Sequence, residues 1–228
     1  MLAGQTLVAR DGYEVALFPM PYLYMTQDEG GDTSHQGTYN LDFIGWNGSS
    51  KVYNAPLYAP VTMKVVNTWL NYNGGNAVFF ESTRPVHLAN GYLDYLTIFF
   101  AHDPNPPYTT VGQTVSQGQV CYHTGEYGIA YGDHVHSCCG QGRYQGTTVR
   151  PTGHTDLTNR IHYWDGVYVN DTTIVQGYGH TWRTWTGPTP PTPSHTSRFP
   201  WVLYARKLRN ERSQTIVWLF YYFMLYRK

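Results

Sequence analysis

The feature that most constrains this chain is a pair of histidines, His134 and His136, separated by the β-branched residue Val135. If this segment is extended, successive side chains point to opposite faces, and the two imidazoles project side by side from one face. Imidazoles so placed lie within reach of one metal ion, and a catalytic zinc site usually combines three protein ligands with a water. The pattern therefore predicts either a metal site with further ligands elsewhere or two histidines on a half-exposed strand.

Composition indicates that the surrounding fold is built from strands. The 228-residue chain is 41% hydrophobic and 16% aromatic, with 21 Tyr, 23 Gly, 14 Pro and only 13% charged residues. This length and apolar content suit one domain with appendages. Frequent Gly and Pro, with abundant aromatic side chains, are typical of many short strands joined by turns. We expect an antiparallel all-β domain.

Charge and cysteine content exclude several classes of protein. The formal net charge is zero, so no whole-surface footprint for nucleic acid is expected. Three cysteines, two of them adjacent at Cys138 and Cys139, do not form a disulfide framework and indicate synthesis in a reducing compartment. Residues 1–10 lack a cationic segment followed by a long apolar run, so no secretory signal is visible.

Turn signals separate a series of apolar segments. Gly74-Gly75-Asn76 predicts a hairpin turn before a strand over residues 77–81, and residues 95–101 predict a buried strand that ends on His102. Asp165-Gly166 predicts a second hairpin. Further strands are expected within residues 41–45, 55–66, 111–120, 160–164 and 167–169.

Six short motifs follow one another along residues 33–140. They are His35-Gln36-Gly37 with Asp42, Tyr58-Ala59-Pro60, Gly74-Gly75-Asn76, Ala101-His102, the run Val-Gly-Gln-Thr-Val-Ser-Gln-Gly-Gln at residues 111–119, and His134-Val135-His136. In this order they resemble the lysostaphin-like (LytM-type) zinc endopeptidases, which cut peptides of bacterial peptidoglycan. The resemblance implies an antiparallel β-sheet core with long loops around a groove. It also implies a zinc-dependent endopeptidase that uses one Zn2+ ion.

Position by position, the resemblance implies that His35, Asp42 and His136 hold the zinc ion. It implies that His134 and His102 line the site as catalytic residues without ligating the metal. Two neutral imidazoles and one carboxylate leave an open tetrahedral position for a water whose pKa falls to about 7. His134 is expected to deprotonate this water or to stabilise the tetrahedral oxyanion, and His102 to perform the complementary task.

Departures from the family pattern leave three alternatives open. The spacing from His35 to Asp42 is longer than in the family, which requires a bulge or a longer loop and makes Asn40 an alternative ligand. Cys138 falls on the histidine face of the strand and is either a core thiol or a fourth ligand that closes the site. Asp133 either orients a histidine or caps its loop.

Other candidate residues match no family motif. Six histidines are expected at the surface or in packing contacts: His87, His123, His154, His162, His180 and His195. Five aromatic residues either stack on substrate or cover the sheet: Tyr163, Trp164, Tyr168, Trp182 and Trp185. Five tyrosines are candidates for the groove: Tyr24, Tyr39, Tyr72, Tyr127 and Tyr131.

Four parts are predicted along the chain. Residues 1–32 form an N-terminal arm, 33–185 the peptidase domain, 186–198 a Pro/Thr-rich linker and 199–228 a basic, aromatic-rich C-terminal tail. The apolar run in the tail, residues 216–226, is shorter than the roughly 20 residues that span a bilayer. The tail is expected to pack on the domain, to dock into an assembly or to touch lipid.

An enzyme that attacks cell wall and shows no secretory signal fits a bacteriophage product, either a virion tail peptidase or a lysin. We expect synthesis in the cytoplasm and action in the virion or, after release, at the host cell wall. Expected partners are peptidoglycan as substrate and phage tail proteins or a membrane surface through the tail, but not nucleic acid. The alternative hypothesis is a catalytically inactive scaffold that serves as a structural or wall-binding virion component.

Overall fold

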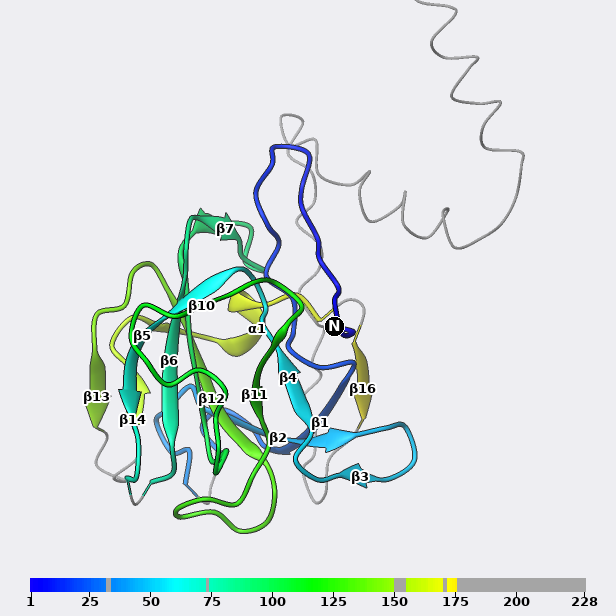
Figure 1. The fold of residues 1–228 in the computed structure, drawn as a ribbon, viewed down its shortest axis with the longest axis vertical. Helices are drawn as coiled ribbons and strands as arrows, with labels where there is room; N and C mark the ends of the chain where they lie inside the picture. Colours follow the sequence, from blue (N-terminus) through cyan, green and yellow to red (C-terminus); the bar gives the residue numbers. More distant parts are fainter. Residues whose placement is uncertain (32–33, 73, 150–154, 170–171, 176–228) are drawn as a thin grey trace, which may run out of the picture.

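The computed structural model confirms an almost entirely β fold (Figure 1). The structure describes residues 1–31, 34–72, 74–149, 155–169 and 172–175. Strands β1 to β16 and one short helix, α1, account for the regular structure of these residues. Among them, no helix has the length and apolar content that crossing a bilayer requires.

One large sheet dominates the fold. Its strand order is β10-β5-β6-β9-β12-β2-β1-β16, and off this path β3 pairs with β2 and β15 with β12. All its pairings are antiparallel except that of β1 with β16. The strands are β1 (Tyr22–Gln27), β2 (Leu41–Trp46), β3 (Lys51–Val52), β5 (Met63–Trp69), β6 (Ala77–Ser82), β9 (Leu96–Ala101), β10 (Thr114–Val115), β12 (Val135–Gln141), β15 (Arg160–Ile161) and β16 (Thr173–Val175).

Three two-stranded sheets complete the strand inventory of the described residues. They are β4 (Pro56–Tyr58) with β11 (Val120–His123), β7 (Val86–His87) with β8 (Leu93–Asp94), and β13 (Thr147–Val149) with β14 (Thr155–Leu157). The loop between β11 and β12 lies at the lower end of the large sheet in Figure 1. This end of the sheet carries the functional site described below.

The central strands β6 and β9 are buried along their whole length. Phe80 and Phe100 belong to the larger apolar cluster, whereas Phe79 and Phe99 belong to a second cluster. Because alternate side chains of a strand point to opposite faces, the two clusters cover opposite faces of the sheet. The near-continuous apolar runs at residues 77–81 and 95–101 thus mark strands that are covered on both sides.

The N-terminal residues pack against the domain. The α-amino group of Met1 donates hydrogen bonds to the carbonyl oxygens of Phe18, at 2.7 Å, and Met20, at 2.5 Å. Strand β1 then joins the large sheet beside β2. The predicted linker and tail, residues 186–198 and 199–228, lie outside the described residues, and the four domain boundaries stay predictions.

The predicted hairpin at Asp165-Gly166 is wrong. These residues end the one-turn helix α1 (Tyr163–Gly166), because the N–H groups of Asp165 and Gly166 donate to the His162 carbonyl at 2.9 and 3.3 Å. The preceding strand β15 pairs with β12 and not with the segment that follows the helix. A Cβ at Gly166 would lie 3.0 Å from the Cβ of Cys139. This glycine therefore permits close packing on β12 and does not form a turn between strands.

Candidate metal centre

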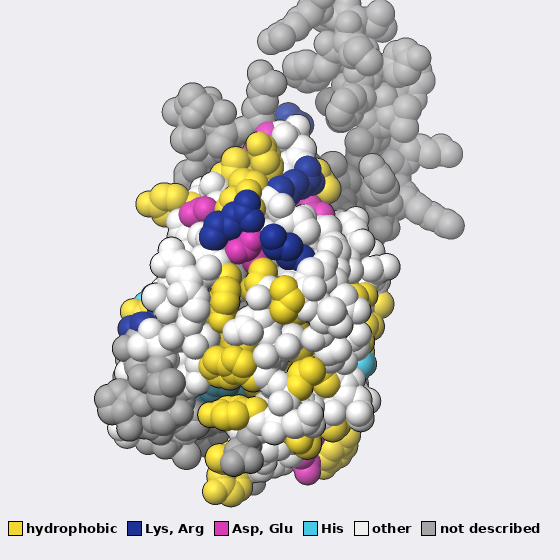
Figure 2. All heavy atoms as spheres, turned by 60° about the vertical axis from the view of Figure 1, so that its left-hand side comes forward, with side chains coloured by type: hydrophobic (Ala, Val, Ile, Leu, Met, Phe, Trp, Pro, Cys, Tyr) yellow, Lys and Arg dark blue, Asp and Glu magenta, His cyan; other side chains and the backbone are white. Residues whose placement is uncertain are grey.

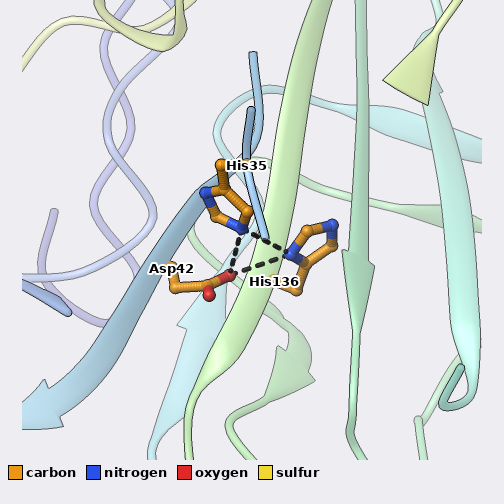
Figure 3. Close-up of side chains that lie close together, drawn as sticks. All are labelled: His35, Asp42 and His136. Carbon is orange, nitrogen blue, oxygen red and sulfur yellow. Dashed lines mark hydrogen bonds and ion pairs between the residues drawn. The ribbon is translucent and has the colours of Figure 1, made fainter. Parts of the chain in front are cut away.

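Three side chains point toward one another at the lower end of the sheet (Figure 3). The Asp42 Oδ1 atom lies 2.9 Å from His136 Nδ1 and 3.3 Å from His35 Nε2, and these two nitrogens are 3.2 Å apart. His35 is fully buried, and the side chains of Asp42 and His136 are each 12% exposed. The structure thus brings together the three residues that the sequence predicts as metal ligands.

Strand register places Asp42 and His136 next to each other. In the antiparallel pair of β2 and β12 the two residues are directly opposite, so their side chains lie on the same face of the sheet. On its other side, β12 pairs with β9, which places His136 opposite Ala101 and brings the following residue, His102, to the same end of the sheet. Two of the predicted ligands therefore follow from one strand pairing.

A turn before β2 accommodates the long spacing between His35 and Asp42. The backbone N–H and the hydroxyl of Thr38 both donate to the His35 carbonyl at 2.9 Å. The His35 Nδ1 atom lies 3.0 Å from the carbonyl oxygen of Asp28, which can only accept, so Nδ1 carries the proton. The other ring nitrogen, Nε2, faces Asp42 Oδ1 at 3.3 Å.

The donor set fits a zinc ion. Ligand distances of about 2.0 to 2.1 Å in tetrahedral geometry place donor atoms about 3.3 Å apart. The observed separations of 3.2 and 3.3 Å match this spacing, and that of 2.9 Å is slightly shorter. Two imidazole nitrogens and one carboxylate oxygen suit Zn2+ and leave one tetrahedral position for a water.

Burial and charge set the protonation states of the ligands. Burial raises the pKa of Asp42, but the nearby imidazoles of His136 and His35 outweigh it and hold this pKa well below its usual value. Burial lowers the pKa of His136, and the Asp42 carboxylate opposes this only in part. At neutral pH the carboxylate is therefore ionised and the His136 imidazole neutral, as metal binding requires.

His102 and His134 lie beside these three residues. Their ring centroids are 4.6 Å apart, and Nε2 of His134 is 3.9 Å from Asp42 Oδ2. In each ring Nδ1 faces a backbone carbonyl, that of Tyr127 at 3.0 Å for His102 and that of Gly132 at 2.7 Å for His134. Because carbonyls only accept, Nδ1 is the protonated nitrogen in both neutral rings, and Nε2 is free to accept a proton.

His102 is held in a conformation that few side chains adopt. Its φ of 90° lies in the left-handed region. Its carbonyl accepts from Tyr127 N–H at 3.0 Å. Cβ atoms added at Gly75 or Gly125 would lie 2.7 Å from His102 Nδ1 and 2.2 Å from its carbonyl oxygen. The two glycines are thus required for the close packing around His102.

A buried hydrogen-bond chain fixes the residue that follows His102. The backbone N–H of Asp103 donates to the Tyr122 hydroxyl at 3.1 Å, and that hydroxyl donates to the Asn76 carbonyl. Sequence reasoning did not find the roles of Tyr122 and Tyr127, because no local pattern marks these long-range contacts.

The pKa of His102 is lowered to about 3. Burial is the largest cause, and the charges of His134 and His136 add to it.

The structure decides between the alternatives for Cys138 and Asp133 but not for Asn40. Cys138 is on the histidine face as predicted, but its thiol donates to Asp156 Oδ1 at 3.0 Å and lies in the core, so it is not part of the metal cluster. The side-chain nitrogen of Asn40 donates to the Thr155 carbonyl at 3.0 Å, whereas its Oδ1 atom is buried without a hydrogen-bond partner among the described residues, so Asn40 stays an alternative ligand. Asp133 caps its loop: it accepts from Asn54 N–H at 3.0 Å and from the Thr124 hydroxyl at 2.6 Å.

Histidines outside the cluster have other partners. His87 pairs with Asp11 at 2.8 Å, His123 with Asp103 at 3.0 Å, and His162 with Glu29. These three lie away from the metal cluster, as expected of surface or packing residues. The other three predicted non-ligands, His154, His180 and His195, lie outside the described residues.

A cavity of about 930 Å³ opens over the cluster and is lined by Asp42, His102, His134 and His136. On the face of the molecule drawn in Figure 2, histidine is visible between hydrophobic side chains in the lower part of the view. Of the tyrosines predicted for the groove, three line the cavity and two do not: Tyr24, Tyr72 and Tyr131 line it, Tyr39 stacks on His162, and Tyr127 contacts His102 through its backbone.

Two of the five aromatic residues predicted either to stack on substrate or to cover the sheet are buried. Tyr163 is 2% and Tyr168 3% exposed, so both cover the core and cannot stack on substrate. Trp164 is partly buried and packs against the larger apolar cluster. Trp182 and Trp185 lie outside the described residues.

Comparisons with known proteins add a phage relative. No protein-family model matches the chain. Over 176 residues the chain is 34% identical to "Morphogenesis protein 1" of Bacillus phage B103, a match that covers 76% of this chain and 45% of the relative. The chain thus spans less than half the length of that relative.

The solved structures that are similar to the chain include two catalytic domains. The catalytic domain of the antimicrobial peptidase lysostaphin from Staphylococcus simulans is 21% identical with a TM-score of 0.37, and the match covers 54% of this chain and 80% of that domain. A variant of the catalytic domain of the prophage-encoded M23 protein EnpA from Enterococcus faecalis is 18% identical with a TM-score of 0.41, covering 58% and 90%.

Proposed function

We propose that this chain is a zinc metalloendopeptidase of the lysostaphin-like family that hydrolyses peptide bonds in bacterial peptidoglycan. The observation that carries the proposal is the convergence of His35 Nε2, Asp42 Oδ1 and His136 Nδ1 beside an open cavity. Two further histidines with free Nε2 atoms line the same cavity. Together they provide a cation site and two proton acceptors, which are the groups that metal-assisted hydrolysis of an amide requires.

In this proposal His35, Asp42 and His136 hold one Zn2+ ion. When bound, zinc lowers the pKa of water toward about 7 and stabilises negative charge on a carbonyl oxygen. The carbonyl of Asp28 orients His35 through Nδ1, a type of contact that fixes the tautomer of ligating histidines. The strand pairing of β2 with β12 orients the other two ligands.

His134 is the residue that takes a proton from the attacking water. Its Nε2 carries the lone pair, because Nδ1 donates to the Gly132 carbonyl. The carboxylate oxygen Asp42 Oδ2 lies 3.9 Å from this nitrogen. The same nitrogen then returns the proton to the leaving amine.

His102 has the complementary role of orienting that water. A neutral His102 with its Nδ1–H committed to the Tyr127 carbonyl can accept a hydrogen bond at Nε2 but cannot donate one there. It therefore positions a water proton and does not stabilise the oxyanion by donation. The left-handed backbone and the packing against Gly75 and Gly125 hold the ring in this orientation.

Phage origin is the second part of the proposal. The similarity to a phage morphogenesis protein supports a product that is mounted on the virion and acts on the host cell wall. Within this proposal, residues 199–228 attach the enzyme to phage tail proteins or to a membrane surface. A lysin released at lysis is the other placement for the same activity.

An inactive scaffold is the competing function, and the name of the phage relative favours it because morphogenesis is a structural task. The intact convergence of three ligands and two free imidazole nitrogens supports the enzyme instead. Loss of catalysis would remove the reason to retain this arrangement.

The test is digestion of purified peptidoglycan by the zinc-loaded full chain, with released amines identified by mass spectrometry. We expect new amino termini that a chelator abolishes. The variant His134→Ala should lower the rate by about 100-fold or more, whereas His87→Ala, a matched histidine paired with Asp11 outside the site, should retain it. Stoichiometric zinc without new amines from any peptidoglycan type would establish the scaffold instead.

A further inference from the structure

A lysine and a tryptophan lie together on one wall of the cavity. In the antiparallel pair of β2 and β3, Lys51 is directly opposite Trp46, so both side chains are on the same face. Both line the cavity. The Trp46 ring packs against Tyr24 with centroids 4.6 Å apart. The wall therefore combines one ammonium group with an apolar aromatic surface.

Lys51 is close to the catalytic residues. Its Nζ atom is 3.7 Å from the position that a Cβ on Gly132 would occupy. The carbonyl of Gly132 accepts the Nδ1–H of His134 at 2.7 Å. The ammonium thus lies beside the loop that orients His134, on the wall of the cavity that the metal cluster also lines.

The charge of Lys51 is available to a ligand. Among the described residues no carboxylate lies within ion-pair distance of its Nζ, which sits 4.9 Å from the Tyr53 ring centroid. Asp42 and Asp133 are the carboxylates of the cavity wall. Asp42 belongs to the metal cluster, and both oxygens of Asp133 already accept hydrogen bonds.

We propose that Lys51 binds a carboxylate of the substrate adjacent to the scissile bond, while Trp46 and Tyr24 pack against the same substrate residue. This inference rests on the proposed function and names its substrate class. An acidic stem peptide, such as one with a free α-carboxylate on a γ-linked glutamyl residue, satisfies the ammonium. A neutral glycine bridge or an amidated stem leaves the ammonium without a partner.

The experiment compares two synthetic peptides that differ in one group. One is L-alanyl-γ-D-glutamyl-L-lysyl-D-alanine, and the other is the same peptide with the glutamyl α-carboxylate converted to an amide. Dissociation constants by calorimetry and kcat/KM for cleavage are measured separately for the zinc-loaded chain, for Lys51→Gln and for Lys64→Gln. Lys64 is the matched control, because it lies on β5 outside the cavity lining and pairs with Glu81.

We expect the chain to prefer the acid form by about tenfold or more, a preference that Lys51→Gln removes and Lys64→Gln retains. Equal binding of the two forms, binding of neither, or an undiminished preference in Lys51→Gln would overturn the inference. Selective binding of the acid form without cleavage supports the subsite and contradicts the hydrolase. Cleavage without selectivity contradicts the subsite and supports the hydrolase.

Discussion

Gly75 lies against the ring of His102: a Cβ at this glycine would come within 2.7 Å of His102 Nδ1 and 2.8 Å of the Tyr127 carbonyl oxygen. The glycine has a φ of 105°, and His102 has a φ of 90°. The contact joins the turn before β6 to the residue that follows β9. It links a motif that looks purely structural in the sequence to the orientation of a proposed catalytic residue.

We predict that Gly75→Ala lowers kcat by about tenfold or more without loss of zinc, because the added methyl group displaces His102 from its hydrogen bond to Tyr127. The control is Gly112→Ala, which places the same methyl group on a glycine with a φ of 93° and open space around it. Both variants carry backbone strain of about 1 kcal/mol from their positive φ, and Gly75→Ala adds the clash with His102 and Tyr127, so it should unfold at a lower denaturant concentration than Gly112→Ala; kcat is compared where both proteins are folded. Equal kcat values for the two variants would show that the contact with His102 is irrelevant.

Glu29 makes the stability of the protein depend on pH. Burial raises its pKa from 4.5 to about 7, against the opposing hydrogen bonds from His162 and Tyr163. Because the pKa is higher in the folded state, the folded protein binds this proton more tightly than the unfolded chain does. The contribution of Glu29 protonation to the free energy of unfolding is therefore fully present below pH 4.5 and is lost as the pH rises through 7. The difference between a pKa of 4.5 and one of about 7 corresponds to at most about 3 to 4 kcal/mol.

The measurement is urea unfolding of the metal-free protein between pH 5 and pH 8, with Glu29→Gln as the comparison. A glutamine stays neutral, so the free energy of unfolding should fall less with pH in the variant than in the parent protein. Parallel pH profiles for the two proteins would refute the raised pKa.

Cys138 should have no part in metal binding, because its thiol donates to Asp156 in the core. We expect Cys138→Ala to retain one zinc per chain with unchanged affinity. Zinc titration against a chromophoric chelator measures this directly. A loss of affinity of tenfold or more in this variant would restore the thiol as a fourth ligand.

Local sequence patterns predicted the parts of the fold that depend on alternation and apolar runs. Residues 77–81 and 95–101 became β6 and β9, since a continuous apolar run suits a strand covered on both faces. The alternation around Val135 placed His136 and Cys138 on one face of β12. At Asp165-Gly166 the same reasoning failed. Gly166 allows a short helix to pack closely against Cys139, and it does not form a turn between strands.

Long-range contacts were beyond the sequence. The hydroxyl of Tyr122 reaches the carbonyl of Asn76, 46 residues earlier, and so fixes the backbone beside His102. The position of Lys51 in the cavity follows from the pairing of β2 with β3 and from the loop at Gly132. Such contacts depend on the assembled sheet. The motifs could name the candidate ligands, but not the groups that orient them.

Zinc content tests the central claim most directly. The purified chain is loaded with zinc, dialysed and analysed by inductively coupled plasma mass spectrometry, together with Asp42→Ala and Asn40→Ala, and folding is checked by circular dichroism. Coordination by His35, Asp42 and His136 predicts one zinc per chain in the parent protein and in Asn40→Ala, and less than about a tenth of that in Asp42→Ala. Full zinc occupancy in a folded Asp42→Ala protein would contradict the account.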